Sequence, residues 1–405
     1  MKQTIPFIYG TPSWHSPARF FDHLSASLAG LGYDIARLDS GAEDFDRSLL
    51  DVMAKRDPAF FFSFNFKGAD VRIDGRPFYD AAGARYITTL DTPYNKVEQI
   101  QRAGTRIGYW AADPSFTPFI QRLAPDSVRY LNFRSMAIVD EADVADSVIP
   151  PLAQRPIDVL FIGSIRRTSG VLESADPGFR RFEKRFHEQA FSNCQTPVYL
   201  LAETIARGEA DFEALFQGEF RSPGFGMMIW ALTNAVRTRR RIRVLEELAR
   251  AAERCRVVTV TDDVDQVKRR FPPALSDFVL PYQKWDALVH LMKHAKIVIN
   301  TEPLQVESAH ERLLTAMACG AAVFSNRNVY LGNRFRHGRD IYFFEFQPGR
   351  LLKGLAEALG DPNGLENAAR AGRESVLGRD LPRHRAGMLI DAVRAFETGS
   401  QAVFN

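Results

Sequence analysis

The sequence predicts an α/β fold with two Rossmann-like domains that face each other across a cleft, the second domain carrying a helical insertion. Three observations predict this fold. Short apolar runs alternate with amphipathic helical stretches, a pattern typical of βαβ units with parallel strands. The length of 405 residues suits two domains of roughly 150 to 200 residues each. A proline-rich segment at 148–156, VIPPLAQRP, lies between two such series and predicts a linker.

The first domain is expected over residues 1–150. A helix is predicted over 18–31, because Phe20, Leu24 and Leu28 recur every four residues on one face. The predicted strands are short and apolar, and they fall at 5–9, 35–38, 59–66, 85–90, 106–111 and 128–133. Ligands of open α/β sheets bind beyond the carboxyl ends of the strands, so the loops after these strands are expected to carry the site.

The second domain is expected over residues 151–380, followed by a C-terminal segment at 381–405 with a helix at 382–396. A nearly continuous apolar run, IDVLFI, begins the domain as a buried parallel strand would. Further strands are predicted at 256–260, 278–280, 297–300 and 322–325. Residues 179–254 are predicted to be largely helical and form the insertion.

Composition narrows the class of protein. Hydrophobic residues make up 45% and charged residues 25%, which is typical of a soluble globular chain. A net charge of +3 is too small to indicate nucleic-acid binding. The cysteines, Cys194, Cys255 and Cys319, lie far apart and predict neither disulfides nor a zinc site. With no secretory signal and no apolar run long enough for a transmembrane helix, a cytoplasmic setting is expected.

The segment 297–328, IVINTEPLQVESAHERLLTAMACGAAVFSNRN, carries the strongest local signal. It is expected to run strand, polar loop, helix, glycine and strand. Ser308 is a favourable N-cap and Glu311 follows three positions later, which predicts a capping box and a helix starting near Ser308. Backbone N–H groups at such a helix start bind anions, and the pyrophosphate of a nucleotide-sugar fits this site. The alternative is an ordinary βαβ unit in which the capping box serves stability alone.

A second candidate phosphate site follows the strand 157–162. Gly163 lets the backbone approach a phosphate, Ser164 follows it, and Arg166 is placed to neutralise charge on a departing diphosphate. A lone glycine after a strand is also typical of a simple tight turn.

Acceptor-side candidates lie on the strand-end loops of the first domain. Asp91 is placed to orient or deprotonate an acceptor hydroxyl, although Asp before Thr-Pro is also a common turn former. On neighbouring loops, Gly10 leaves room for a ligand and Trp14 can stack on a sugar. The same loops contribute three polar residues, Thr11, His15 and Asn65.

Two further patterns have structural interpretations. His290 and His294 share a helix face, as zinc ligands do, but no third ligand is apparent and a structural role is favoured. The run RTRRRIR at 237–243 could bind a phosphate-rich acceptor or contact an anionic membrane surface. With Glu246 and Glu247 close behind, a solvated helix face with ion pairs is the preferred interpretation.

The block HERLLTAMACGAAVFSN resembles the signature of GT-B glycosyltransferases of the family 4 type, especially the CgeB-like group. The runs FFFSFNF, YITTLDTPYN and IDVLFIGSIRR are similar to other parts of that group. The resemblance implies the GT-B architecture and metal-independent, retaining transfer from a nucleoside-diphosphate sugar, with a UDP-sugar preferred and no other cofactor. It also implies that the C-terminal helix packs back toward the first domain. The class of acceptor stays open: it could be a glycan or a protein, as in bacterial-type glycosylation, or a small molecule.

The resemblance also assigns roles to individual residues. Glu307 matches the first acidic position, which contacts the donor sugar. The second acidic position, which binds ribose, falls on Thr315, and Glu311 lies one turn earlier as a substitute. His310 and Arg312 stand at the helix start, where they can meet phosphate oxygens, and Tyr282 lies in the turn expected to face the nucleobase.

Two other functions remain open on the same fold, because fold does not determine function. One is a nucleotide-sugar epimerase, which needs no acceptor. The other is a non-catalytic nucleotide-sugar-binding protein, which the change from an acidic residue to Thr315 makes a real alternative.

Overall fold

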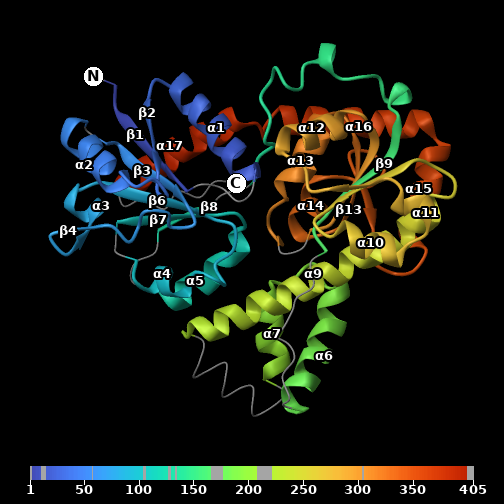
Figure 1. Cartoon of the computed structure of the whole chain (residues 1–405), viewed down its shortest axis with the longest axis horizontal. Helices are drawn as coiled ribbons and strands as arrows, with labels where there is room; N and C mark the ends of the chain where they lie inside the picture. The colour runs from blue at the N-terminus through green and yellow to red at the C-terminus, as the bar shows by residue number, and fades with distance from the viewer. Residues whose placement is uncertain are drawn as a thin grey trace. The chain divides into compact units, whose positions relative to one another are not determined.

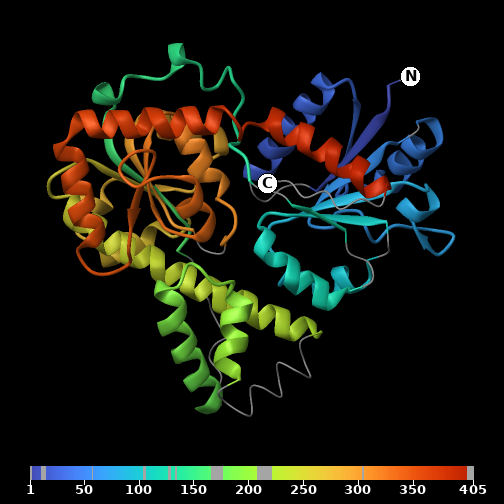
Figure 2. The same cartoon turned by 180° about the vertical axis from the view of Figure 1, so that it is seen from behind.

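The structure is a computed structural model that describes residues 2–10, 15–56, 58–103, 106–125, 129–132, 135–165, 177–207, 221–302 and 305–398. The chain forms two units, Met1–Ile138 with Leu381–Asn405, and Val139–Asp380 (Figures 1 and 2). The proline-rich segment therefore belongs to the second unit and does not separate the two. Its Leu152 joins the core of that unit, and buried Arg155 donates hydrogen bonds to the carbonyls of Ala295 (2.9 Å) and Cys319 (3.3 Å).

The first unit contains a six-stranded, all-parallel sheet in the order β2-β1-β3-β6-β7-β8. The order changes direction between β1 and β3, which creates a crevice at the carboxyl ends of these two strands. The strands span Thr4–Tyr9 (β1), Asp34–Asp39 (β2), Phe60–Phe64 (β3), Arg85–Leu90 (β6), Ile107–Ala111 (β7) and Arg129–Asn132 (β8). A two-stranded hairpin, which the sequence analysis did not predict, follows β3 at Arg72–Ile73 (β4) and Arg76–Pro77 (β5).

Helices pack on both faces of this sheet (Figure 1). Helices α1 (His15–Gly30) and α17 (Pro382–Thr398) lie side by side, and the C-terminal helix thus belongs to the first unit. The apolar faces of both helices share one core with β1 and β3, in which Leu24, Leu28 and Leu389 are almost fully buried. The other helices are α2 (Phe45–Lys55), α3 (Phe78–Ala81), α4 (Val97–Gln101), a 3-10 turn (Pro114–Phe116) and α5 (Thr117–Leu123).

The second unit contains another six-stranded parallel sheet, in the order β11-β10-β9-β12-β13-β14. This is the Rossmann strand order, and its direction changes between β9 and β12. All six strands are short and largely buried, as their apolar sequences require. They span Ile157–Ile162 (β9), Val257–Thr261 (β10), Val279–Pro281 (β11), Ala295–Asn300 (β12), Ala322–Asn326 (β13) and Tyr342–Phe344 (β14).

The predicted helical insertion is formed by α6 (Pro177–Ser192), α7 (Val198–Ala206) and the long α9 (Pro223–Ala251) (Figure 1). The C-terminal half of α9 contributes side chains to the core beside the sheet, and α6 and α7 contact α9 and each other. The remaining helices are α10 (Val264–Arg270), α11 (Pro273–Ser276), α12 (Trp285–Lys293), α13 (Glu311–Ala318), α14 (Val329–Arg334), α15 (Arg350–Gly360) and α16 (Pro362–Leu377), with 3-10 turns at Asp146–Val148 and Leu152–Gln154. None of the helices in the described part of the chain combines the length and the apolar composition that a membrane span needs.

Candidate functional site

The switch point of the second sheet gathers the loops after β9 and β12, the start of α13 and one face of α9. The loop after β9 is fixed by Asp262, which follows β10. Its carboxylate accepts hydrogen bonds from the hydroxyl of Ser164 and from the backbone N–H of Ile165 (2.8 Å). The carbonyl of Ser164 in turn accepts a hydrogen bond from Arg241 Nη1 of α9 (2.7 Å). Ser164 therefore lies where the sequence analysis placed it, with its hydroxyl already engaged.

Gly163 has a packing role in this loop. A Cβ at this position would lie 2.7 Å from the ring of Phe161 and 3.3 Å from Cδ of Arg241. The glycine thus allows the Arg241 side chain to pass close to the end of β9. Access of a phosphate to the Gly163 backbone stays a prediction, and Arg166 lies outside the described residues.

Helix α13 begins two residues later than the capping box predicted. Its N-cap is His310, whose Nδ1 accepts a hydrogen bond from the backbone N–H of Arg312 (3.2 Å). The predicted start at Ser308 is wrong because the preceding loop is held by tertiary contacts. The side-chain amide of Asn328 donates to the carbonyls of Gln305 and Ser308, both at 2.8 Å. Glu311 is accordingly the first residue of the helix and does not close a capping box.

Glu302 links β12 to the start of α13. Its Oε1 accepts hydrogen bonds from Asn300 Nδ2 (2.8 Å) and from the backbone N–H of His310 (3.0 Å). Its other oxygen, Oε2, is buried and has no hydrogen-bond partner among the described residues. Burial raises the pKa of Glu302 to about 8. The sequence analysis did not single out this residue, although its place directly after a predicted strand marked it as a candidate.

Positive charge accumulates at the same place. The guanidinium of Arg312 donates to Asn300 Oδ1 (3.1 Å), and its Nε is buried without a hydrogen-bond partner among the described residues. Burial lowers the pKa of Arg241 well below its usual range, and the charges of Arg237 and Arg312 lower it further. Burial and these same arginines also lower the pKa of His310 well below its usual range. Three guanidinium groups thus share one largely buried site.

This arrangement corrects the interpretation of the arginine run on α9. Arg240 and Arg241 are each only 4% exposed, so the expected solvated face is wrong for both. Because Arg237 and Arg241 are four residues apart, they share one helix face, and that spacing was the signal available in the sequence. Of the two acidic residues behind them, Glu246 pairs with Arg243 (3.0 Å).

The remaining donor-side candidates differ in how deeply their side chains are buried. Tyr282 is 40% exposed; burial raises its pKa and the charge of Glu311 adds to the shift, which places it near the helix start. Glu307 is exposed, and its contact with a donor sugar stays a prediction. Thr315 is fully buried and its hydroxyl donates to the carbonyl of Glu311 (2.8 Å), which argues against the predicted contact with ribose.

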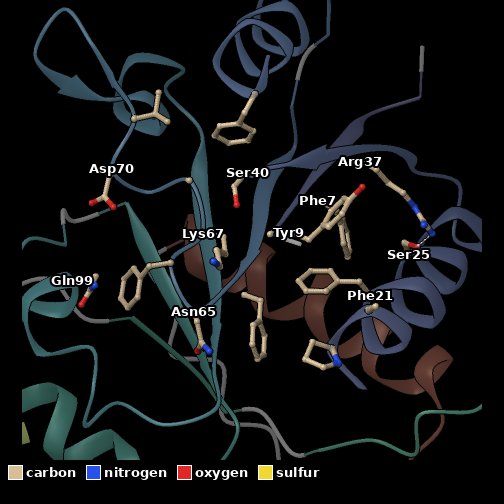
Figure 3. Close-up of a pocket in the computed structure, with 18 of the residues that line it drawn as sticks. Phe7, Tyr9, Phe21, Ser25, Arg37, Ser40, Asn65, Lys67, Asp70 and Gln99 are labelled. Atoms are coloured by element: carbon tan, nitrogen blue, oxygen red, sulfur yellow. Dashed lines mark hydrogen bonds between the residues drawn. The ribbon is translucent and has the colours of Figure 1, made fainter. Parts of the chain in front are cut away.

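The first unit has its own cavity at the switch point between β1 and β3, of about 820 Å³ (Figure 3). Gly10 and Asn65 line it, and their role on the acceptor side stays a prediction. Asp91 does not line it. The carboxylate of Asp91 accepts a hydrogen bond from the N–H of Thr92 (2.7 Å), which is the turn-forming role weighed from the sequence. Thr11 and Trp14 lie outside the described residues; His15 begins α1, and its side chain is not described.

Comparisons with known proteins agree with this architecture. A family model described as glycosyl transferase-like matches residues 238–391, less than half of the chain. A search of curated proteins found no match. Two solved structures superimpose over 98% of this chain: a glycosyltransferase from Rickettsia africae ESF-5 (10% identity, 100% of that chain, TM-score 0.58), and HepE of Anabaena in complex with UDP-glucose (10%, 99%, 0.51). An alpha-glucosyltransferase in complex with UDP and a 13-mer DNA containing an HMU base covers 97% of this chain (10% identity, 100% of that chain, TM-score 0.55).

These likenesses identify the class of fold. The chain has the α/β fold of GT-B glycosyltransferases, with a parallel, Rossmann-like sheet in each of its two units. Residues 238–391, which the family model matches, include Arg241, Glu302, His310 and Arg312 of the cationic site.

Proposed function

We propose that this protein is a glycosyltransferase that moves a sugar from a UDP-sugar to an acceptor hydroxyl. The observation that carries the proposal is the group formed by buried Arg241 and Arg312 and half-buried Arg237 at the switch point between β9 and β12. Open α/β sheets bind nucleotides at such points, and clustered guanidinium groups favour a diphosphate. The family match over this part of the chain supports the proposal, as do complexes of HepE with UDP-glucose and of the alpha-glucosyltransferase with UDP.

In the proposed reaction the bond between the anomeric carbon and the UDP oxygen breaks, and a bond from that carbon to the acceptor oxygen forms. The acceptor hydroxyl releases its proton to solvent, and UDP departs with the additional negative charge. Arg241 and Arg312 stabilise that charge from a site prepared before the reaction, which is the role a metal ion plays in other transferases. The proposal therefore includes metal-independent transfer, and retention at the anomeric carbon follows from the family 4 resemblance.

The acceptor is proposed to bind the first unit, where the cavity lies at the second switch point. The alpha-glucosyltransferase of similar fold is in complex with DNA, whereas the net charge of +3 here favours acceptors other than nucleic acid. Cys194, Cys255 and Cys319 are all free thiols, which supports a reducing, cytoplasmic setting.

Replacing Arg312 with methionine is expected to weaken UDP binding about 10- to 100-fold, because a charge-assisted hydrogen bond contributes about 1.5–3 kcal/mol. Calorimetric titration of the full chain with UDP, GDP and dTDP measures this effect and tests the nucleobase. Arg270→Met is the matched control, because it removes the same charge from an exposed side chain of the same unit.

The thermal transition of unliganded Arg312→Met is expected to stay close to that of the wild type, since the variant also removes a buried, crowded charge. If none of the three nucleotides binds the wild type, the transferase proposal is overturned. Incubation with UDP-glucose alone addresses the epimerase alternative: an isomerised sugar in the absence of acceptor would favour that function.

A further inference from the structure

The cavity of the first unit is built around one lysine. Lys67 follows β3, and Figure 3 shows its side chain between Asn65 and Ser40 in the middle of the cavity. A Cβ at Gly10 would lie 2.9 Å from Lys67 Cε, 3.0 Å from Nζ and 3.1 Å from Ser40 Oγ. The absence of a side chain at Gly10 therefore keeps open the space that the ammonium group occupies.

The loop that carries Lys67 is strained and firmly held. Asn65 and Phe66, neither of them glycine, have positive φ angles of 51° and 62°. Such residues cost about 1–3 kcal/mol each and persist where their surroundings hold them. The N–H of Phe66 donates to the hydroxyl of Thr88 (2.9 Å), and the hydroxyl of Tyr86 donates to the carbonyl of Lys67 (2.7 Å). The sheet thus fixes the backbone from which the Lys67 side chain extends.

The charges around the cavity are equal in number, three basic and three acidic side chains, but not all of them form ion pairs. Arg37 is neutralised by Asp22, whose Oδ1 lies 2.7 Å from Arg37 Nη1. Among the described residues, Lys67 has neither an ion pair nor a side-chain hydrogen bond. Asp46 and Asp70 also line the cavity, but neither carboxylate pairs with Lys67. Its ammonium is available to an anion that enters.

The remaining walls suit a ring compound. Tyr9 and Phe64 are partly exposed and line the cavity with their aromatic rings. The side chains of Asn65 and Ser40 supply an amide and a hydroxyl beside the ammonium. A volume of about 820 Å³ falls within the range of small-molecule sites.

We infer that this cavity binds an anionic acceptor: a hydroxylated ring compound whose carboxylate or phosphate group pairs with Lys67. That the ligand is an acceptor rests on the proposed transferase function. That the ligand is an anion rests on the cavity itself. Aromatic rings pack on the ring faces, Asn65 and Ser40 bind hydroxyl groups, and the fixed loop holds the backbone of Lys67 in place before the ligand arrives.

Calorimetric titration of the full chain, with no nucleotide present, tests the inference with two matched probe pairs. Para-nitrophenyl glucuronide and para-nitrophenyl glucoside differ in a carboxylate; glucose-6-phosphate and glucose differ in a phosphate. At least one charged probe is expected to bind about three- to tenfold more tightly than its neutral counterpart, the gain typical of one accessible ion pair and its hydrogen bonds. The pair that shows the preference identifies the anionic group.

Lys67→Met is expected to abolish the preference, and Lys67→Arg to keep most of it. Lys55→Met is the matched control, because it removes the same charge from an exposed lysine outside the cavity. The inference is overturned if neither charged probe binds, if charged and neutral probes bind equally, or if the preference survives in Lys67→Met. If the chain binds UDP but shows no preference for a charged probe, the proposed function stands and the inference is overturned. If it shows the preference but does not bind UDP, the proposed function is overturned, and the cavity binds an anionic ligand other than an acceptor.

Discussion

Replacing Arg240 with methionine is expected to lower the free energy of unfolding of the second unit by about 3–5 kcal/mol. The guanidinium, 4% exposed, donates hydrogen bonds to carbonyl oxygens from two parts of the chain. At the end of α6 it binds the carbonyls of Ala190, Phe191 (3.0 Å) and Asn193 (3.0 Å). It also binds the carbonyl of Glu302 (3.2 Å). Methionine fills much of the same volume but leaves all four carbonyls, which are buried or partly buried, without this donor.

Arg239→Met is the matched control for this prediction, because Arg239 is the exposed neighbour on the same helix and its contact with the ring of Phe191 is a weak one. Its expected effect is below about 1 kcal/mol. Scanning calorimetry measures both variants, and for a unit of this size a loss of 3–5 kcal/mol lowers Tm by about 6–20 °C. Hydrogen exchange should localise the loss to α6. Equal Tm values for the two variants would contradict the role assigned to Arg240.

Much of the fold follows from local sequence patterns. The apolar runs of both units form strands within one or two residues of their predicted positions, because a buried parallel strand needs little more than a short apolar segment. The predicted strand at 59–66 ends early, at Phe64. Asn65 and Phe66 leave the extended conformation, and no glycine signals the change in the sequence. Their conformation depends on Thr88 and Tyr86, more than nineteen residues away, and so was not predictable from local patterns.

The start of α13 shows the same limit. Ser308 and Glu311 have the spacing of a capping box, yet Asn328 binds the Ser308 carbonyl and Glu302 binds the N–H of His310. These long-range hydrogen bonds hold residues 305–310 as a loop and move the helix start to Glu311. Local capping preferences contribute about 1 kcal/mol, which several buried hydrogen bonds easily exceed.

The sequence analysis predicted a site at this position, but only some of the residues that form it. The switch point and the residues His310 and Arg312 could be predicted, because strand order and helix starts locate anion sites in this fold. Arg241 was interpreted as solvated, since a run of arginines on a helix is usually exposed. Its burial depends on the packing of α9 against the end of β9, where Gly163 makes room for it.

Glu302→Gln is expected to remove a pH dependence of stability and to stabilise the second unit at alkaline pH by about 2–4 kcal/mol. Glu302 is 1% exposed, and burial raises its pKa from 4.5 to about 8. Between these pH values the folded state keeps the proton while the unfolded state has released it. Because the folded state then binds more protons, the stability contributed by Glu302 is complete below about pH 4.5 and declines until about pH 8.

Glutamine at 302 preserves the acceptor oxygen for Asn300 and His310 and cannot titrate. Thermal unfolding from pH 5 to pH 8.5 is therefore expected to show a falling Tm for the wild type relative to Glu302→Gln, with the two curves meeting near pH 5. Glu307→Gln, an exposed carboxyl replaced in the same way, should follow the wild type. UDP binding by Glu302→Gln should be at least as tight as that of the wild type at pH 8.5, since a negative charge beside Arg312 is gone. Parallel stability curves for all three proteins would mean that Glu302 is ionised at neutral pH and balances the arginines.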